Sequence, residues 1–373
     1  LGRIWYEMRK GDTALKGECR YLVGRPKEVF LAAGEKVPPE HEGRNDLSQE
    51  ELLKQPVYIE HRPKKDPRDL RVLDPACGSG HFLLYAFDLL ERIYEEAWGD
   101  PESPNYGNTG RTLPEDFGTL DDLRREIPKL IMEHNLHGID IDPRAVQIAA
   151  LALWLRTQKT WKNLGIKAAE RPRVAKSNIV TAEPMPGEED MKEEFTAGLK
   201  PQVLGQIVDE VFEKMKLAGE AGTLLKIDED IKEAVASAGK QWREGPRPEQ
   251  QLLYPTMDAA PRPKQQELRF DVKGITDEGF WSQAEDRILD ALKDYAEQAE
   301  NGRAGRRRLF ADDAAQGFAF IDLCRKRYDV MLMNPPFGTA CANTKDYLSR
   351  CYERSKSDIA FNFIDRSLRL AES

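Results

Sequence analysis

The stretch from Leu70 to Leu83 constrains the fold of this chain more than any other part of the sequence. It reads Leu-Arg-Val-Leu-Asp-Pro-Ala-Cys-Gly-Ser-Gly-His-Phe-Leu. Val72 suits a short buried strand, and the two glycines permit backbone angles and close approaches that a Cβ atom would prevent. From His81 to about residue 96, apolar residues recur at helical spacing. The pattern predicts a strand, a glycine turn and a helix, a common binding site for a nucleotide-like ligand in parallel sheets.

An acidic residue stands before the glycines of this motif. Asp74 follows the strand directly, ahead of Gly78 and Gly80. A carboxylate at this place would repel a pyrophosphate but attract a cation, and S-adenosylmethionine carries an ammonium and a sulfonium group and no phosphate. Taken alone, the motif is just as compatible with a purely structural strand-to-helix turn.

A second strand that ends in acids follows about sixty residues later. Residues 135–144 read Asn-Leu-His-Gly-Ile-Asp-Ile-Asp-Pro-Arg, and Pro143 suits the first turn of a following helix. A carboxylate at the tip of the strand beside the glycine turn can bind ribose hydroxyls. We therefore predict ribose binding by Asp140, adenine packing by Ile141 and helix capping by Asp142. The alternative is that these acids merely end a strand.

The next segments predict a third strand and then a long helical region. Residues 173–180 resemble a strand, and Asn178 at its end is a candidate contact to the adenine edge. Between residues 183 and 318 the apolar residues recur at helical spacing. Because the next strand appears only at Tyr328, we interpret 183–318 as a helical insertion in an α/β domain. Its basic run Asn301–Arg308 could contact DNA phosphates, although a solvated loop is the simpler interpretation.

A second chemical motif lies at residues 328–338, Tyr-Asp-Val-Met-Leu-Met-Asn-Pro-Pro-Phe-Gly. The apolar strand ends in Asn334, and Pro335 and Pro336 force a rigid turn because proline continues neither a ladder nor a helix. The Asn334 side-chain oxygen and the Pro335 carbonyl can accept both hydrogens of a planar amine, while Phe337 stacks on its ring. This frees the nitrogen lone pair for in-line attack on a sulfonium methyl. The alternative is a structural turn with Phe337 in the core.

The composition of the chain limits the classes of protein to which it can belong. The chain has 373 residues, of which 40% are hydrophobic and 32% charged, and a net charge of −9. These values indicate a soluble globular protein and not an unspecific coat for nucleic acid. No run is apolar enough to span a membrane, and the cysteines and histidines lack metal-ligand spacing, so we expect a cytoplasmic protein with reduced thiols and no metal. The basic run His61–Arg68 is more typical of a solvated loop than of a phosphate clamp.

Together the two motifs resemble the N6-adenine DNA methyltransferases in which the cofactor motif precedes an Asn-Pro-Pro-aromatic motif. The sequences of these motifs are most similar to those of the large single-chain enzymes of restriction-modification and phage-defence systems, including the PglX-type methylases of BREX loci. The match covers roughly residues 70–182 and 328–373. The resemblance implies a Rossmann-like α/β core that binds S-adenosylmethionine and methylates the N6 amine of an adenine flipped out of double-stranded DNA. Other subunits of a defence system would be partners.

The resemblance also implies a set of site residues. For the cofactor it implies Asp74, Ala76, Gly78, Gly80 and Asp140. We add Pro75 and Phe82, which lie in the same motif, and Ile141 and Asn178, which were predicted above to contact the adenine. The catalytic candidates are Asn334, Pro335, Pro336 and Phe337. Residues 358–364 resemble the family helix that lies against the target base. The Thr-Pro element that usually precedes the first motif is not recognisable.

These patterns predict a chain of several parts. They are a helical lead-in and linker (1–60), the cofactor-binding half of the core (61–182), the helical insertion (183–318) and the catalytic half (319–373). The family sheet has more strands than this chain supplies, so we expect a core truncated at its C-terminus.

Two alternatives to this function stay open. A protein glutamine methyltransferase shares the Asn-Pro-Pro-aromatic turn but usually has Tyr where this chain has Phe337. A catalytically silent DNA-binding subunit of such a system would not need an intact Asn334.

Overall fold

The computed structural model describes residues 1–39, 48–175, 177–200, 203–232, 277–297, 304–355 and 358–371. The chain divides into two compact units, which are described separately. Unit 1 comprises Leu1–Thr181, Gly222–Leu224 and Lys326–Ser373, and unit 2 comprises Ala182–Ala221 and Leu225–Arg325.

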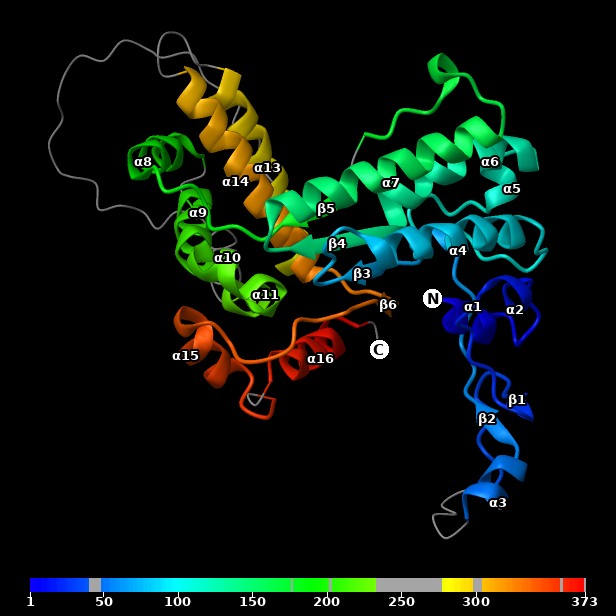
Figure 1. The fold of residues 1–373 in the computed structure, drawn as a ribbon. Helices are drawn as coiled ribbons and strands as arrows, with labels where there is room; N and C mark the ends of the chain where they lie inside the picture. Colours follow the sequence, from blue (N-terminus) through cyan, green and yellow to red (C-terminus); the bar gives the residue numbers. More distant parts are fainter. Residues whose placement is uncertain are drawn as a thin grey trace, which may run out of the picture. The chain divides into compact units, whose positions relative to one another are not determined.

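Unit 1 is built on a four-stranded parallel sheet in the order β5-β4-β3-β6 (Figure 1). The strands are β3 (Val72–Asp74), β4 (Leu136–Asp140), β5 (Asn178–Thr181) and β6 (Val330–Met331). The chain moves outward from β3 through β4 to β5 and then returns to the other side of β3, so the strand order reverses between β3 and β6. Such a reversal is where open α/β sheets bind ligands, at the carboxyl ends of the strands. The predicted α/β Rossmann-like fold is confirmed.

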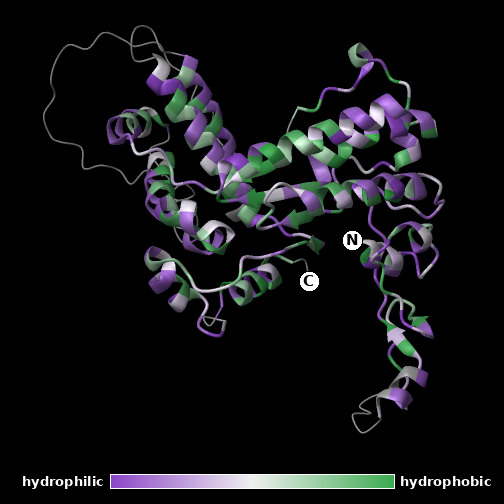
Figure 2. Ribbon diagram, in the orientation of Figure 1, coloured by the Kyte–Doolittle hydropathy of each residue, from purple (hydrophilic) through white to green (hydrophobic). Residues whose placement is uncertain are grey.

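Helices of unit 1 pack on this sheet through apolar faces. The helices α4 (His81–Trp98), α6 (Leu120–Leu130) and α7 (Pro143–Asn163) contact one another, and α4 and α7 contact β4. The strands are largely hydrophobic in Figure 2, whereas α4 shows hydrophobic and hydrophilic residues side by side. Most of its buried side chains recur at intervals of three or four residues, as a helix with one apolar face requires: Leu83, Ala86, Phe87, Leu89, Leu90, Ile93, Tyr94 and Ala97. This face forms part of the core of unit 1.

The remaining elements of unit 1 flank the sheet or precede it. They are α1 (Gly2–Met8), α2 (Leu15–Glu18), β1 (Glu28–Phe30), α3 (Gln49–Lys54), β2 (Val57–Ile59), α5 (Leu113–Asp116), α15 (Ala342–Cys351) and α16 (Ile359–Leu370). The lead-in, predicted to be helical, also contains the parallel pair of β1 and β2, so that prediction was wrong in part. Strands of three residues are too short to show a period of two in the sequence.

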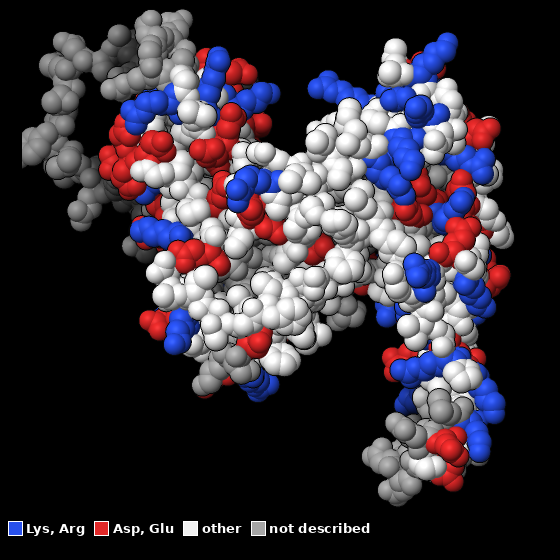
Figure 3. Space-filling model, in the orientation of Figure 1, with Lys and Arg blue, Asp and Glu red and all other residues white. Residues whose placement is uncertain are grey.

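Unit 2 is helical where it is described. Its helices are α8 (Glu189–Gly198), α9 (Val203–Lys214), α10 (Ala218–Ala221), α11 (Ile227–Asp230), α13 (Asp277–Glu297) and α14 (Ala304–Arg325). The prediction of a solvated loop for the basic run Asn301–Arg308 was wrong from residue 304 onward, because these residues begin α14. Residues 301–303 lie outside the described part of the chain. Arg306 bonds to Asp190 at 3.2 Å, and Arg307 pairs with Glu194. Acidic and basic side chains accordingly lie close together on the face drawn in Figure 3.

None of the helices in the described ranges is both long and apolar enough to cross a bilayer.

A buried asparagine holds the two central strands of unit 1 where they begin. Asn135 directly precedes β4, and its Nδ2 donates to the carbonyls of Pro67 at 2.6 Å and Leu70 at 2.7 Å, just before β3. Its Oδ1 accepts from the Tyr94 hydroxyl of α4 at 2.9 Å. One side chain therefore bonds to two buried carbonyls and one buried hydroxyl, and the Leu70 carbonyl and the Tyr94 hydroxyl would be costly to leave without a partner.

Replacing this asparagine should cost more than removing any one of its partners. Asn135→Leu leaves the Leu70 carbonyl and the Tyr94 hydroxyl without a partner, while the Pro67 carbonyl keeps its bond from the Leu70 amide at 3.1 Å. This variant should lower the free energy of unfolding by about 3 kcal/mol, whereas Tyr94→Phe loses one bond and should cost about 1 kcal/mol. Urea unfolding of both variants gives the comparison. Equal losses would show that the contacts of Asn135 to the carbonyls before β3 contribute nothing.

Candidate active site

The glycine turn after β3 is anchored to the neighbouring strand by backbone bonds. Gly78 and Gly80 adopt positive φ angles of 50° and 82°. The Cys77 amide donates to the Ile139 carbonyl of β4 at 2.9 Å, and the Gly80 amide donates to Cys77 at 2.8 Å. The turn is therefore held against β4 before α4 begins at His81.

The two glycines are required for different reasons. A Cβ on Gly80 would lie 3.0 Å from the Ala149 Cβ and 3.3 Å from its Cα, so α7 packs too closely for a side chain. A Cβ on Gly78 would meet nothing within 4 Å. Gly80 therefore serves helix packing, whereas Gly78 lies beside open space at the carboxyl edge of the sheet.

Asp74, the last residue of β3, is buried, with 1% of its surface exposed. Burial raises its pKa to about 7, and the charge of Asp140 acts in the same direction, while a hydrogen bond from the Ala76 amide to its Oδ1 opposes the shift. A buried carboxyl with a raised pKa at a strand end is typical of a functional site, where a cationic ligand would favour the charged form.

Asp140 ends β4 and binds the glycine turn. Its Oδ2 accepts from the Gly78 amide at 2.7 Å, and its Oδ1 accepts from the Asp142 amide at 2.9 Å. A carboxylate has about four lone-pair directions, so each oxygen keeps one for a ligand hydroxyl. Asp142 caps α7 by accepting from the Arg144 amide, which confirms the predicted cap. Ile141 and Phe82, both about half exposed, flank this edge as apolar surface.

The predicted position of Asn178 was wrong. It begins β5 instead of ending the third strand, and it pairs with His137, whereas Thr181 stands beside Asp140. Asn178 thus lies about 10 Å from the carboxyl edge, given three residues of strand. It is buried, and its Nδ2 donates to the Glu133 carbonyl at 3.0 Å, which is a structural role.

The second motif comes to the strand next to the glycine turn, as predicted. Val72 pairs with Val330 and Leu73 with Met331, and the Leu332 amide continues the ladder to the Leu73 carbonyl at 2.8 Å. Asn334 follows two residues later and is exposed. Figure 1 shows β6 beside β3.

The Asn-Pro-Pro-Phe turn presents its aromatic ring to solvent. Phe337 is 79% exposed, so the alternative in which it belongs to the core is excluded. The Ile359 amide donates to the Gly338 carbonyl at 3.0 Å, and the Asp358 carboxylate, which caps α16, accepts from the Ala360 amide at 2.8 Å. The start of α16 therefore fixes the chain where it leaves the turn.

A segment that the sequence patterns do not predict also reaches this edge. Gly222–Leu224 forms a short 3₁₀ turn, η6, which contacts β4, and the Thr223 hydroxyl donates to the Pro75 carbonyl at 2.7 Å. Nothing in the local sequence marks such a long-range contact. Asp358 begins the segment predicted as the next family helix, and an Asp before an apolar helical run is a standard helix-start signal.

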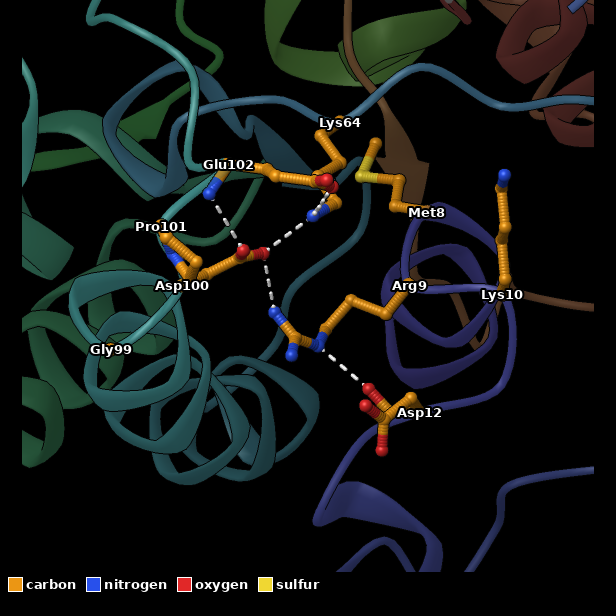
Figure 4. A pocket seen from close by; sticks show the side chains of 9 residues that line it. All are labelled: Met8, Arg9, Lys10, Asp12, Lys64, Gly99, Asp100, Pro101 and Glu102. Atoms are coloured by element: carbon orange, nitrogen blue, oxygen red, sulfur yellow. Dashed lines mark hydrogen bonds and ion pairs between the residues drawn. The ribbon is translucent and has the colours of Figure 1, made fainter.

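The first basic run, His61–Arg68, is exposed at His61 and Arg62, as predicted for a solvated loop, while its later basic residues form ion pairs. Lys64 binds Asp100 at 2.7 Å, as does Arg9 at 2.8 Å, in a depression of about 380 Å³ that Figure 4 shows from close by. Within the described ranges, no group of His, Cys, Asp and Glu side chains is arranged to hold a metal ion.

Comparison with known proteins identifies the family. Residues 134–373, more than half of the chain, match the Eco57I restriction-modification methylase family, and residues 62–182 match the DNA-methyltransferase domain of MmeI. The chain belongs to the Eco57I restriction-modification methylase family. The resemblance seen in the sequence motifs is thereby confirmed.

Two bacterial relatives match shorter segments. The chain is 41% identical over 88 residues, 24% of its length, to the adenine-specific methyltransferase BrxX of Escherichia coli O9:H4 (strain HS). It is 34% identical over 96 residues, 26% of its length, to the adenine-specific methyltransferase PglX of Lacticaseibacillus casei (strain Zhang). The matched segments cover 5% and 6% of these relatives.

The raised pKa of Asp74 predicts a pH dependence of stability. The pKa of Asp74 is about 7 in the folded chain, above the ordinary value of 3.8 for the unfolded chain. As pH rises, the unfolded chain therefore loses the Asp74 proton first. The stability that the protonated Asp74 contributes is lost as pH rises toward 7. Asp74→Asn removes this loss because asparagine does not titrate. The free energy of unfolding of the variant, relative to that of the parent, should therefore be higher at pH 8 than at pH 5 by roughly 2 kcal/mol.

Urea unfolding at the two pH values measures this difference. Asp121→Asn, which changes a carboxylate that is 91% exposed at the start of α6, is the matched control and should show no such gain. A relative stability of the Asp74 variant that does not change with pH would contradict the buried, proton-binding state of Asp74.

The two glycines should respond differently to alanine. Gly80→Ala places an alanine in the left-handed backbone conformation and brings its Cβ too close to α7, so it should lower the free energy of unfolding by about 2–4 kcal/mol. Gly78→Ala has only the backbone penalty and should lower it by about 1–2 kcal/mol. Thermal or urea unfolding of the purified variants provides the test. A smaller loss for Gly80→Ala than for Gly78→Ala would mean that α7 does not approach the turn as closely as described.

Proposed function

We propose that this chain binds S-adenosylmethionine at the β3–β4 edge and transfers its methyl group to the N6 amine of adenine in DNA, within a restriction-modification or phage-defence system. The observation that carries the proposal is the parallel pairing of β3 with β6. It brings Asp74 and Asn334 to neighbouring strand ends, and methyl transfer needs its reacting atoms within about 3–3.5 Å of each other. Family membership supports the same reaction class.

The residues at this edge fit the proposed cofactor. Asp74 and Asp140 offer carboxylates to a ligand that carries two cationic groups and ribose hydroxyls. The space beside Gly78 is open, so its backbone can be approached closely. Ile141 and Phe82 offer half-exposed apolar surface to an adenine ring. The cofactor would supply an electrophilic methyl group on its sulfonium.

The Asn-Pro-Pro-Phe turn would hold the acceptor. The Asn334 side-chain oxygen and the Pro335 carbonyl would each accept one amine hydrogen, and the exposed Phe337 ring would stack on an adenine flipped out of duplex DNA. Pro336 keeps the turn rigid, so little ordering remains to be done when the base arrives. Catalysis would then rest on positioning and on electrostatic stabilisation, with no covalent intermediate.

Two other activities are compatible with parts of the motif. A glutamine methyltransferase would use the same turn, but the two relatives described above bear the name adenine-specific methyltransferase, which favours adenine. A silent DNA-binding subunit would tolerate loss of Asn334 and Phe337, and both are present. Mass spectrometry of nucleosides and of peptides after incubation with methyl-labelled cofactor separates the three possibilities.

Separate variants should distinguish cofactor binding from transfer. Asn334→Ala in the intact enzyme should keep its affinity for S-adenosylmethionine and lose transfer by about 10²-fold or more, because Asn334 acts on the acceptor amine. Asp140→Ala should weaken cofactor binding about 10- to 100-fold, because it removes a charged partner of the ribose. Calorimetry measures the binding and label incorporation into unmethylated duplex DNA measures the transfer.

Either half of this result could contradict the proposal. Transfer at the parental rate by the Asn334 variant would exclude its catalytic role. Unchanged affinity in a folded Asp140 variant would remove that residue from the cofactor site.

A further inference from the structure

The turn Gly222–Leu224 is separate in sequence from every other part of unit 1. The residues on both sides of it belong to unit 2, yet the turn itself belongs to unit 1. Thr223 is completely buried. A buried polar side chain in such a detached turn requires a partner, and its partners lie on both halves of the proposed active site.

The first contact is to the glycine turn that follows β3. The Thr223 hydroxyl donates to the Pro75 carbonyl at 2.7 Å. Pro75 follows Asp74 directly and precedes Ala76, whose amide donates to the Asp74 carboxylate. The neighbouring Gly222 has a positive φ of 54°, and a Cβ there would lie 2.9 Å from Ile141. The turn thus touches both strand ends that are proposed to bind the cofactor.

The second contact is to the helices that follow the Asn-Pro-Pro-Phe turn. The backbone carbonyl of Thr223 accepts from Arg366 Nε of α16 at 3.0 Å, and the Leu224 carbonyl accepts from the Tyr352 hydroxyl at 2.9 Å. Leu224 also forms a small buried cluster with side chains of α15, α16 and the segment between them, against which Ala76 and Met333 pack. Met333 immediately precedes Asn334.

We infer that Thr223 is a positioning residue that holds the cofactor turn and the catalytic turn in one arrangement. The inference deepens the proposed methyl transfer and rests on it. Pro75, Thr223 and Arg366 form one buried chain of hydrogen bonds, in which the hydroxyl fixes the carbonyl that follows Asp74 and the backbone carbonyl fixes α16. Thr223 acts through these groups, because it is buried behind the turn whose residues would bind the ligand.

A substitution that removes only the hydroxyl tests this role. Thr223→Val keeps the branched shape and should weaken binding of S-adenosylmethionine about tenfold by calorimetry, since it leaves a buried carbonyl without its donor. Thr223→Ser keeps the hydroxyl and should stay within about threefold of the parent. Thr157→Val is the matched control, because Thr157 is equally buried but its hydroxyl donates within α7, to the Trp154 carbonyl at 2.7 Å, and cofactor affinity should not change.

Hydrogen exchange in the absence of cofactor gives a second readout. Thr223→Val should speed the exchange of amides in residues 75–78, while Thr157→Val should not. This measurement keeps the inference testable even if the parent chain binds no S-adenosylmethionine, a result that would count against the proposed function and not against the positioning role.

Three results would overturn the inference. The first is unchanged exchange in residues 75–78 of Thr223→Val, and the second is equal weakening by the Val and Ser variants, which would point to packing instead of the hydroxyl. The third is failure of both Thr223→Val and Thr223→Ala to fold, because the hydroxyl would then hold the whole fold and not the turn.

Discussion

The hydrogen bond from the Gly78 amide to the Asp140 carboxylate is the contact on which the rest of the site depends. It joins the turn after β3 to the end of β4 at 2.7 Å, and the bond from the Cys77 amide to Ile139 runs beside it. Gly78 has a positive φ of 50°, which glycine adopts without a steric penalty. With the turn held in this way, Asp74 stays buried below it, and burial is the main cause of its raised pKa.

The other half of the site follows from the reversal of strand order. Because β6 pairs with β3 on the side away from β4, the turn that begins at Asn334 reaches the same edge as Asp74. The two prolines give this turn little freedom, and α16 holds the chain after Gly338. A site that acts by positioning needs this kind of rigidity, since its catalytic power comes from geometry set before the substrate binds.

Much of this arrangement could be predicted because the signals are local. The glycines, the acids at the ends of β3 and β4, and the prolines after Asn334 each impose a backbone geometry that can be read from a few residues. The neighbouring positions of β3 and β6 followed from the chemistry, which demands that the two motifs meet.

The errors have physical causes. Asn178 was misplaced because strand limits depend on pairing partners, and β5 pairs from its first residue with His137 of β4. The arginines of α14 suggested a loop because the acidic side chains that bind them lie on α8, more than a hundred residues earlier. Thr223 could not be found at all, since its partners, Pro75 and Arg366, are both more than a hundred residues away in sequence.

Photolabelling can show whether the ends of β3 and β6 form one site. Ultraviolet irradiation of the protein with S-adenosylmethionine that is radiolabelled in its methyl group attaches label to side chains near that group. We expect label in the peptide that contains Asn334–Phe337, and excess unlabelled cofactor should prevent this labelling. Competed label confined to peptides without any residue of this turn or of the turn after β3 would contradict this expectation.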